Sequence, residues 1–375
     1  MSNIEKKDGF QSQWGFIMAC IGSAVGMANI WRFPYMVSAY GGMTFLLPYF
    51  LFVVLIGCSG VMEEFSLGRW GGAGPVGSFG KAMEDGGKSK KLGEALGIIP
   101  VIGSMGIAIG YSVVMGWIFL YAKRALTGEL FGYGQDMGAI GGAFGMVAPE
   151  AATLGEALGM IGGLGFSNWL WITVAVVVSF VIMILGVAGG IEKSCKVMIP
   201  VLFFLFVALA IYIGFLPGAA DGYKYIFTIN PAGLADPKTW IYAFGQAFFS
   251  LSLGFGTIMT YASYVDKKEN IMFQSTATAV SDLMFAMIAG VAIMPAVFAF
   301  GLNPQSGPGL VFETLPLVFG QMPAGGLVAI LFFLALLVAA LTSSISMLEV
   351  AVAYLVEEKK FSRIAACIVL FIICW

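Results

Sequence analysis

Residues 16–50 read FIMACIGSAVGMANIWRFPYMVSAYGGMTFLLPYF, a stretch that is apolar enough to enter a bilayer. Its middle is a poor helix, because small, polar and charged residues crowd into a few turns: Gly22, Ser23, Gly26, Asn29, Arg32 and Pro34. Each glycine costs a helix interior about 1 kcal/mol relative to alanine, and a charge at the bilayer centre costs roughly 2.5–3.5 kcal/mol. A lipid-facing anchor would avoid both costs. The stretch therefore predicts a broken span whose freed carbonyls line a polar cavity. The alternative is an unbroken helix that packs through Gly22 and Gly26.

The whole chain has the composition of a membrane protein. Of its 375 residues, 59% are hydrophobic and 11% are charged, whereas soluble domains run near 25% charged. We therefore predict an all-α polytopic protein with one transmembrane domain, residues 1–375, embedded in a lipid bilayer. The net charge of −2 and the lack of a basic stripe argue against a nucleic-acid partner. The chain has no histidine, which excludes histidine bases, imidazole metal ligands and histidine triads.

Apolar runs long enough to span a bilayer, roughly 17–25 residues, recur along the chain. They fall at about 14–38, 43–68, 95–122, 167–187, 197–216, 241–263, 271–300 and 327–355. A ninth run begins near residue 362 and is still continuing at Trp375. Two segments between the runs do not read as simple spans. Residues 127–166 predict an outer loop or hairpin, and residues 302–326, broken by Pro and Gly, predict a re-entrant or capping loop.

The basic residues predict the orientation in the membrane. If the N-terminus is inside, fourteen lysines and arginines fall in inner segments and four in outer ones, and with the intramembrane Arg32 these account for all 19. Because cytoplasmic loops carry an excess of Lys and Arg, we predict a cytoplasmic N-terminus.

A second span is interrupted in the same way as the first. Residues 244–264 read FGQAFFSLSLGFGTIMTYASY, with Ser250, Ser252, Gly254 and Gly256 in the middle. A pair of interrupted spans at corresponding positions in two halves indicates a transporter binding site. The positive ends of half-helices can face a carboxylate, and unwound carbonyls can face a cation.

Three further polar groups lie inside spans. Asp282 is in the seventh, the run Thr342-Ser343-Ser344 is in the eighth, and Tyr111 is in the third. Such carboxylate and hydroxyl oxygens are the ligands that a hard cation prefers. The hydroxyls could instead bond back to carbonyls of their own helix, and Tyr111 could serve packing alone. An intramembrane acid is a functional residue by default.

Four motifs carry a resemblance to a known family: GSAVGMANIWRFPY, GGMTFLLPY, GQAFFSLSLGFGTIMTYASY and LTSSI. Their sequence and order resemble the neurotransmitter:sodium symporter family, in particular its bacterial leucine-transporter-like amino-acid symporters. The resemblance implies inverted five-helix repeats, residues 14–216 and an incomplete 240–375, with unwound first and sixth helices. It also implies a multi-pass protein of the plasma membrane, the inner membrane in a bacterium, that binds an amino acid and two Na⁺ ions midway.

The resemblance assigns oxygen ligands to each ion. The first Na⁺ would take the carbonyl of Ala24, the side chains of Asn29, Ser250 and Asp282, and the substrate carboxylate. The second Na⁺ would take carbonyls and hydroxyls from two helices: Gly22, Val25, Ala339, Thr342 and Ser343.

The resemblance likewise assigns the substrate contacts. The substrate carboxylate would meet the amides near Ala24 and Gly26 and the hydroxyl of Tyr111, and the amino group would meet oxygens near Ser23, Phe249 and Ser252. The side-chain pocket would be formed by Ile107, Phe249, Phe255, Ser344 and Met347. Arg32 and Gln246 would close the outside of the cavity. The inner gate would consist of Lys7, Tyr264 and Glu357.

The chain departs from the family pattern in ways that bear on coupling. Many members have Asn where Asp282 stands, and chloride-dependent members have Ser where Ala286 stands. A fixed carboxylate would supply the charge that chloride supplies elsewhere, so we predict chloride independence. After sodium leaves, the bare carboxylate would take up a proton, which predicts proton counter-transport. Lys7 and Glu357 replace an arginine and an aspartate, and a lysine lacks the bidentate fork, so the inner gate should be weaker.

The apolar pocket predicts a neutral hydrophobic or aromatic amino acid as the substrate. A substrate-sensing relative that does not transport and an ion channel are the alternatives, and sodium-dependent uptake would separate a transporter from a sensor. We expect no enzyme activity, because no nucleophile and base come together among the intramembrane acids.

Overall fold

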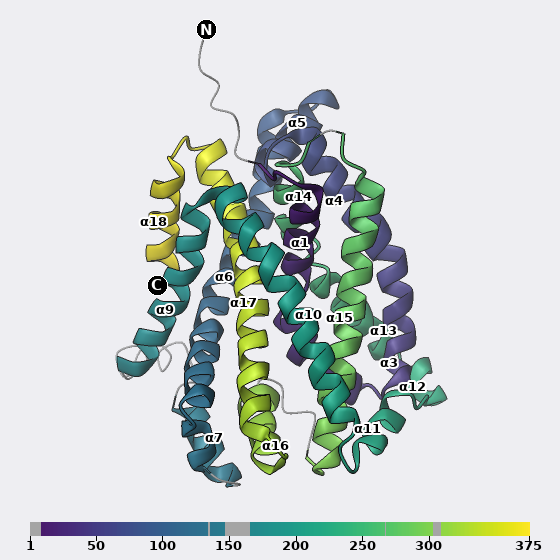
Figure 1. Cartoon of the computed structure of the whole chain (residues 1–375). Coiled ribbons are helices and arrows are strands. Elements are labelled where there is room, and N and C mark those ends of the chain that lie inside the picture. Colours follow the sequence, from purple (N-terminus) through teal and green to yellow (C-terminus); the bar gives the residue numbers. More distant parts are fainter. Residues whose placement is uncertain (1–8, 134–135, 147–165, 267, 303–308) are drawn as a thin grey trace, which may run out of the picture.

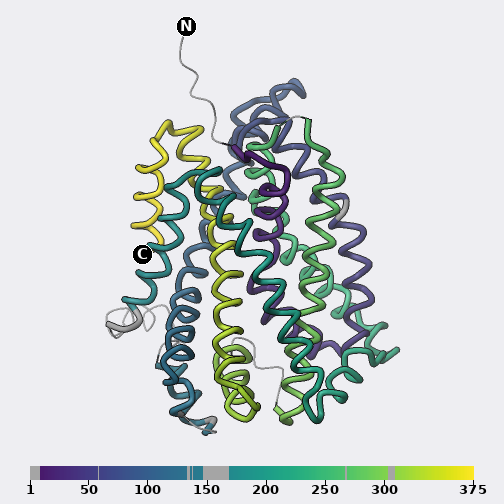
Figure 2. The backbone as a smooth tube through the Cα atoms, in the orientation of Figure 1, coloured from purple at the N-terminus to yellow at the C-terminus, as the bar shows by residue number. Residues whose placement is uncertain are grey.

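The computed structural model describes residues 9–133, 136–146, 166–266, 268–302 and 309–375, and within these ranges every regular element is a helix. The helices run side by side as one bundle (Figures 1 and 2). The first turn of α1 (Gln13–Ala24) and α5 (Pro75–Asp85) lie at one end of the bundle, and α7 (Met137–Gly145), α11 (Ala219–Ile226) and α16 (Leu315–Gln321) lie at the other (Figure 1).

The first predicted span is broken, as expected. It consists of α1 (Gln13–Ala24), the wide turn η1 (Ala28–Arg32) and α2 (Phe33–Ala39), and the two halves are bent by 49° at the break. The second span is continuous through α3 (Met43–Phe52), η2 (Val53–Gly57) and α4 (Cys58–Gly71), and the third is α6 (Lys90–Leu126). The helix α5 lies between spans where we predicted no element.

The middle of the chain differs from the prediction at one boundary. We predicted an inner loop between about 187 and 197, but there the wide turn η4 (Val187–Glu192) runs directly into α10 (Lys193–Gly214). Lys193 and Lys196, which are among the basic residues of the inner segments in the sequence count, lie instead in the first turn of α10. The preceding span is α9 (Phe166–Ile184), and the loop predicted at 127–166 contains η3 (Glu129–Tyr133) and α7, with residues 147–165 outside the described ranges.

The second half repeats the pattern with its own broken span. Short helices α11 and α12 (Pro231–Ala235) lead into α13 (Pro237–Ser250), which is separated from α14 (Thr257–Ala262) by an irregular stretch. The remaining elements are α15 (Ile271–Ala299), η5 (Leu310–Thr314), α16, α17 (Gly325–Glu357) and α18 (Arg363–Cys374). The capping loop predicted at 302–326 thus contains two short helical turns, η5 and α16.

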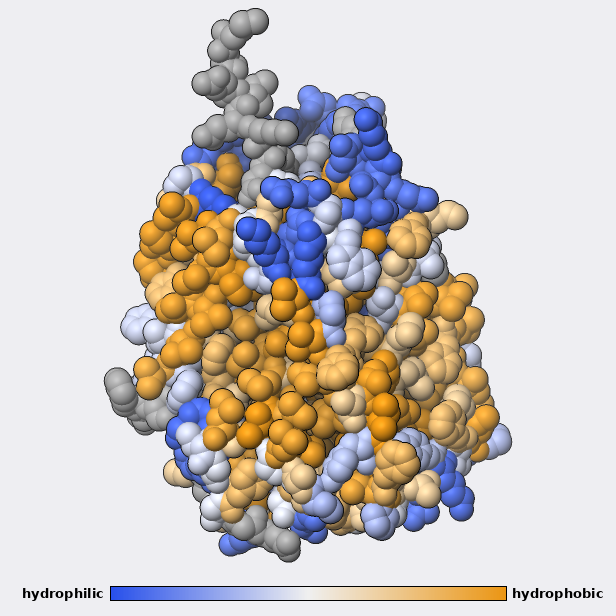
Figure 3. Space-filling model, viewed as in Figure 1, coloured by the Kyte–Doolittle hydropathy of each residue, from blue (hydrophilic) through white to orange (hydrophobic). Residues whose placement is uncertain are grey.

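Length and apolarity identify the membrane spans. Among the described residues, five helices pass both criteria, or six if α1 and η1–α2 count as one bent span. On the face shown in Figure 3, hydrophobic side chains form a broad band between two ends where hydrophilic side chains gather. These helices are therefore those of a multi-pass membrane protein.

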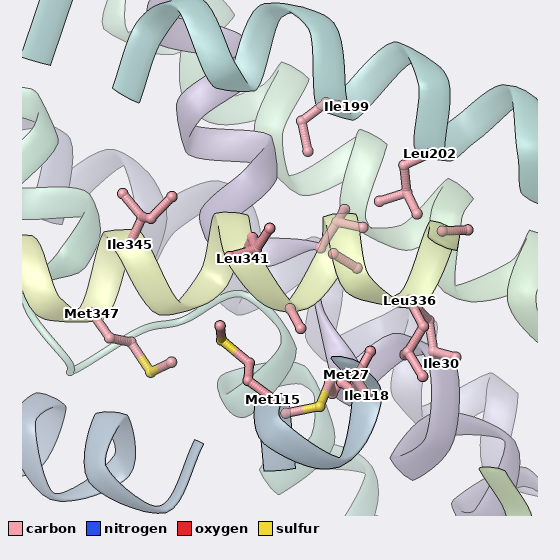
Figure 4. Close-up of a cluster of buried hydrophobic side chains, with 14 of the residues drawn as sticks. Met27, Ile30, Met115, Ile118, Ile199, Leu202, Leu336, Leu341, Ile345 and Met347 are labelled. Atoms are coloured by element: carbon pink, nitrogen blue, oxygen red, sulfur yellow. The ribbon is translucent and has the colours of Figure 1, made fainter. Parts of the chain in front are cut away.

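The core lies around α17, most of whose side chains are buried. Figure 4 shows side chains from the first break, α6 and α10 gathered against this helix. They are Met27, Ile30, Met115, Ile118, Ile199 and Leu202, which surround Leu336, Leu341, Ile345 and Met347 of α17. In a bilayer such helices associate through van der Waals packing and polar contacts rather than through the hydrophobic effect. This packing holds the first broken span beside α17.

Candidate functional site

The first break frees two backbone carbonyls. Val25 at the end of α1 is extended, with φ −76° and ψ 108°, so the helical hydrogen bonds stop there. The hydroxyl of Ser343 on α17 lies 3.3 Å from the carbonyl oxygens of both Gly22 and Val25. A Cβ on Gly26 would lie 2.4 Å from the Ser343 hydroxyl oxygen, so only glycine allows this approach.

The second break is a turn with left-handed backbone. Ser252, Gly254 and Gly256 have φ of 54°, 82° and 74°, and a non-glycine residue held there costs of order 1–3 kcal/mol. The strain is offset by contacts that fix the turn. The Ser252 hydroxyl donates to the Ser23 carbonyl at 2.9 Å, and the half-buried Glu64 accepts from the Gly254 amide at 2.6 Å. The two breaks are therefore directly bonded to each other.

A fully buried carboxylate lies between the two breaks. Asp282 on α15 is 0% exposed and accepts from the Asn29 amide nitrogen at 2.8 Å and from the Ser250 hydroxyl at 2.8 Å. The oxygen of the Asn29 amide faces the other way and accepts from the Gly26 amide at 3.0 Å. Asp282, Asn29 and Ser250, predicted to share one sodium ion, thus form one hydrogen-bonded cluster. A buried negative charge of this kind needs a cation or a proton.

The oxygens predicted for the second sodium ion also gather. Besides the contacts of Ser343, the hydroxyl of Thr342 lies 3.1 Å from the Ala339 carbonyl oxygen and 3.2 Å from that of Val338. This back-bonding within α17 is the alternative that the sequence left open for the hydroxyls. The Ser343 hydroxyl instead contacts the carbonyl oxygens of Gly22 and Val25 at the first break. It thereby links the oxygens of α17 to those of the first broken span.

A cavity opens between these clusters. Its twelve lining residues are Ser23, Ala24, Gly26, Met27, Ala28, Ile107, Tyr111, Phe249, Ser252, Phe255, Ser343 and Met347. They include nine of the ten predicted substrate-binding residues. The hydroxyl of Tyr111 accepts from the Met27 amide at 3.4 Å, beside the first break. The free space is about 40 Å³, room for roughly three water molecules, so a bulky ligand requires lining side chains to move.

Ser344 is the predicted pocket residue that does not line this cavity. It is buried, and its hydroxyl has no hydrogen-bond partner among the described residues. Ser343 and Met347 are four residues apart and share one face of α17, whereas Ser344 is turned about 100° away from Ser343. Its predicted role in the pocket stays a prediction.

One side of the cavity is closed by Arg32. Its guanidinium donates to the side-chain oxygen of Gln246 and lies over the ring of Phe249, 5.3 Å from the ring centroid. Phe249 in turn meets Phe255 edge to face, with the centroids 6.2 Å apart. The predicted pair Arg32 and Gln246 is therefore in contact, above the lining aromatic residues.

The opposite side carries a polar cluster that the sequence indicated only in part. The Tyr264 hydroxyl donates to Glu349 at 2.9 Å, and the guanidinium of Arg363 donates two hydrogen bonds of 2.9 and 2.7 Å to the same carboxylate. Glu357 accepts from the Gly74 amide at 2.7 Å, and Lys7 lies outside the described residues. Glu349 lies within the apolar run at 327–355, so the sequence indicates an intramembrane acid there, but it does not indicate the partner Arg363. An intramembrane acid requires a partner, and this requirement could have prompted a search for a nearby basic residue.

The fold and this site define a class of protein: an ion-coupled membrane transporter. Two broken helices meet at mid-bundle, with a buried carboxylate, free carbonyls and a small cavity between two polar closures. Such a site is typical of secondary transporters with discontinuous helices.

Comparison with known proteins identifies the family. The model of the sodium:neurotransmitter symporter family matches residues 7–133 and 151–375, and the chain belongs to this family. An uncharacterized sodium-dependent transporter of Haemophilus influenzae is 32% identical over 96% of this chain and 77% of the relative. The uncharacterized sodium-dependent transporter YhdH of Bacillus subtilis is 36% identical over 94% of this chain and 74% of the relative.

A solved structure is similar over nearly the whole chain. The crystal structure of MhsT in complex with L-phenylalanine is 38% identical in sequence, with a TM-score of 0.85 over 98% of this chain and 79% of the MhsT chain. The chain is therefore a sodium-dependent transporter with the all-α fold of this family.

Proposed function

We propose that this protein is a sodium-coupled symporter of a neutral hydrophobic or aromatic amino acid. The observation that carries the proposal is the cavity between the two breaks, whose lining has apolar and aromatic side chains and no charged one among the described residues. The similar MhsT structure holds L-phenylalanine, which supports the same class of substrate. Met347 is flexible enough to adapt to side chains of different shape. The activity is transport and not catalysis.

Two sodium ions would bind beside the substrate. The cluster of Asp282, Asn29 and Ser250, with the Ala24 carbonyl and the substrate carboxylate, would hold the first. The free carbonyls near Ser343, with Ala339 and Thr342, would hold the second. Because the substrate carboxylate completes the shell of the first ion, sodium and substrate bind cooperatively.

Asp282 makes the transport independent of chloride in this proposal. The carboxylate provides a resident negative charge, fully buried and bonded to two other predicted ligands of the same ion. When sodium is released, this charge is left without a cation in a medium of low dielectric constant. It then takes up a proton, and the return step carries that proton in the opposite direction.

Alternating access follows from the two closures. With the N-terminus cytoplasmic, Arg32, Gln246 and Phe255 lie on the outer side of the cavity, and Tyr264 and Glu357 lie on the inner side. The membrane potential contributes about 2.3 kcal/mol per charge per 100 mV. Two sodium ions with a zwitterion therefore gain about 4.6 kcal/mol, enough to hold a gradient above a thousandfold.

Uptake into proteoliposomes tests the proposal. The purified protein is reconstituted, and uptake of radiolabelled neutral amino acids is measured with an inward sodium gradient, with and without chloride. A matched sample carries equal potassium in place of sodium. We expect saturable uptake that requires sodium and persists in gluconate. Sodium-dependent binding without uptake would favour a sensor, and a substrate-independent sodium current would favour a channel.

A further inference from the structure

A buried acid other than Asp282 and Glu349 lies at the end of the bundle where α1 begins. Glu192 is the last residue of η4, immediately before α10, and it is 1% exposed. It is not among the residues assigned above to the substrate, the ions or the gates. A carboxylate buried to this extent must be paired and hydrogen-bonded, so its partners indicate what it does.

The partners of Glu192 come mainly from the start of α1. One carboxylate oxygen accepts from the Gln11 amide at 2.7 Å, and the other accepts from the Ser12 hydroxyl at 2.8 Å. Ser12 is also the N-cap of α1, since its hydroxyl accepts from the Gly15 amide at 3.1 Å. Lys196, one turn further along α10, completes the cluster at 2.6 Å. The acid therefore bonds the N-cap of α1 to the beginning of α10.

Gly15 makes room for this contact. A Cβ at position 15 would lie 2.3 Å from both Cγ and Oε1 of Glu192, a distance that forces one of them to move. The side chain of Glu192 thus lies flat against the first turn of α1, and the fit depends on a residue without a side chain.

We propose that Glu192 is a gate residue that holds α1 closed against α10. The inference rests on the proposed function, since it assigns to Glu192 a step in alternating access. The break after Ala24 makes α1 a separate short helix, bent by 49° from its continuation, so α1 can move while α2 stays in place. The contacts of Glu192 join the far end of this short helix to the rest of the bundle. They must break when the cavity opens at that end.

The position of Glu192 distinguishes it from the cluster around Glu349. That cluster joins Tyr264, Glu349 and Arg363, which lie after α14, on α17 and on α18. Glu192 is bonded to the residues that open α1 itself. Removing the contacts of Glu192 should increase the population of the conformation in which the cavity is open at the end of the bundle where α1 begins. Sodium and substrate affinity should then fall in proportion to the remaining closed fraction.

Thiol labelling can test this directly, because α1 carries a buried reporter. Cys20 is 0% exposed, and in a variant whose other four cysteines are alanine it becomes the single target of a membrane-impermeant maleimide. In sodium-free buffer we expect Glu192→Ala to label about tenfold faster than its parent, a ratio equivalent to about 1.4 kcal/mol. The isosteric Glu192→Gln, which keeps an acceptor for Gln11 and Ser12, should lie between them. The control Glu84→Ala removes an exposed acid and should label at the parental rate.

A double-mutant cycle separates a gate from a loss of folding. Gly15→Ala should also accelerate labelling about tenfold, because the new Cβ displaces Glu192. The double variant Gly15→Ala/Glu192→Ala should be no faster than either single variant, since both remove one contact. Saturating sodium with L-phenylalanine should slow all variants. Parental labelling rates in Glu192→Ala, or multiplying effects in the double variant, would overturn the proposal.

The outcome does not depend on the transport assay. The sodium-free labelling rates report on α1 even if no amino acid is taken up. A protein that shows no uptake but keeps the Glu192 effect contradicts the proposed function and supports the contact as a gate. A protein that transports an amino acid, but whose Glu192→Ala variant labels at the parental rate, supports the proposed function and contradicts the gate.

Discussion

Replacing Asp282 by Asn gives the strongest prediction about coupling. The substitution keeps the size of the side chain and removes a charge that is 0% exposed and bonded to Asn29 and Ser250 at 2.8 Å. A cation about 4 Å from the carboxylate interacts with it by about 4 kcal/mol at an effective dielectric constant near 20. Losing that energy raises the dissociation constant of sodium several hundredfold.

The assay is sodium titration of amino-acid binding in chloride-free buffer, followed by uptake at several internal pH values. We expect Asp282→Asn to need several hundredfold more sodium, to recover part of its affinity when chloride is added, and to lose the response of uptake to internal pH. Ser250→Ala is the matched control, because it keeps the charge and removes one donor, and it should cost about tenfold. A variant with nearly parental sodium affinity without chloride, and an unchanged pH response, would refute the reasoning.

Three further substitutions probe other parts of the structure. Gly42→Ala should destabilise the protein by about 2 kcal/mol or more, because φ is +57° and its Cβ would lie 2.2 Å from a backbone oxygen of α11. Gly103→Ala is the control: it lies inside α6, its Cβ would meet nothing within 4 Å, and it should keep or raise the melting temperature, because alanine favours a helix over glycine. Arg363→Met should cost about 3–5 kcal/mol by leaving Glu349 buried without its cation, and adding Glu349→Met should restore most of the loss in the same melting assay. Ser343→Ala should raise the sodium dissociation constant about tenfold, and an unchanged sodium titration would exclude this hydroxyl as a ligand.

The positions of the breaks could be predicted because their causes are local. Small, polar and charged residues crowded around Gly26 in an apolar run disfavour an undisturbed helix, and Ser252 and Gly254 repeat that signal in the second half. Both breaks occur in the structure, and the intramembrane Asp282 lies between them. Local composition was sufficient here because, inside a bilayer, backbone that is not helical is tolerated only where it is buried in protein or lines a polar cavity.

Pairings between distant segments could not be predicted in this way. The sequence places Arg363 just before the ninth apolar run, where it resembles a loop residue, but in the structure it pairs with Glu349 on a neighbouring helix. The sequence around Glu192 does not indicate its partners Gln11 and Ser12, which lie about 180 positions away. A single sequence shows that a buried acid needs a partner, but helix packing decides which residue supplies it.

The central claim is that the two breaks and Asp282 form one site where an amino acid binds with sodium. Its most direct test is equilibrium binding to the purified protein in detergent, with a panel of radiolabelled L-phenylalanine, L-leucine and L-methionine, in sodium and in potassium. We predict saturable binding of at least one of the three in sodium and none in potassium. Equal binding in both salts, or no binding of any of the three in sodium, would contradict the account.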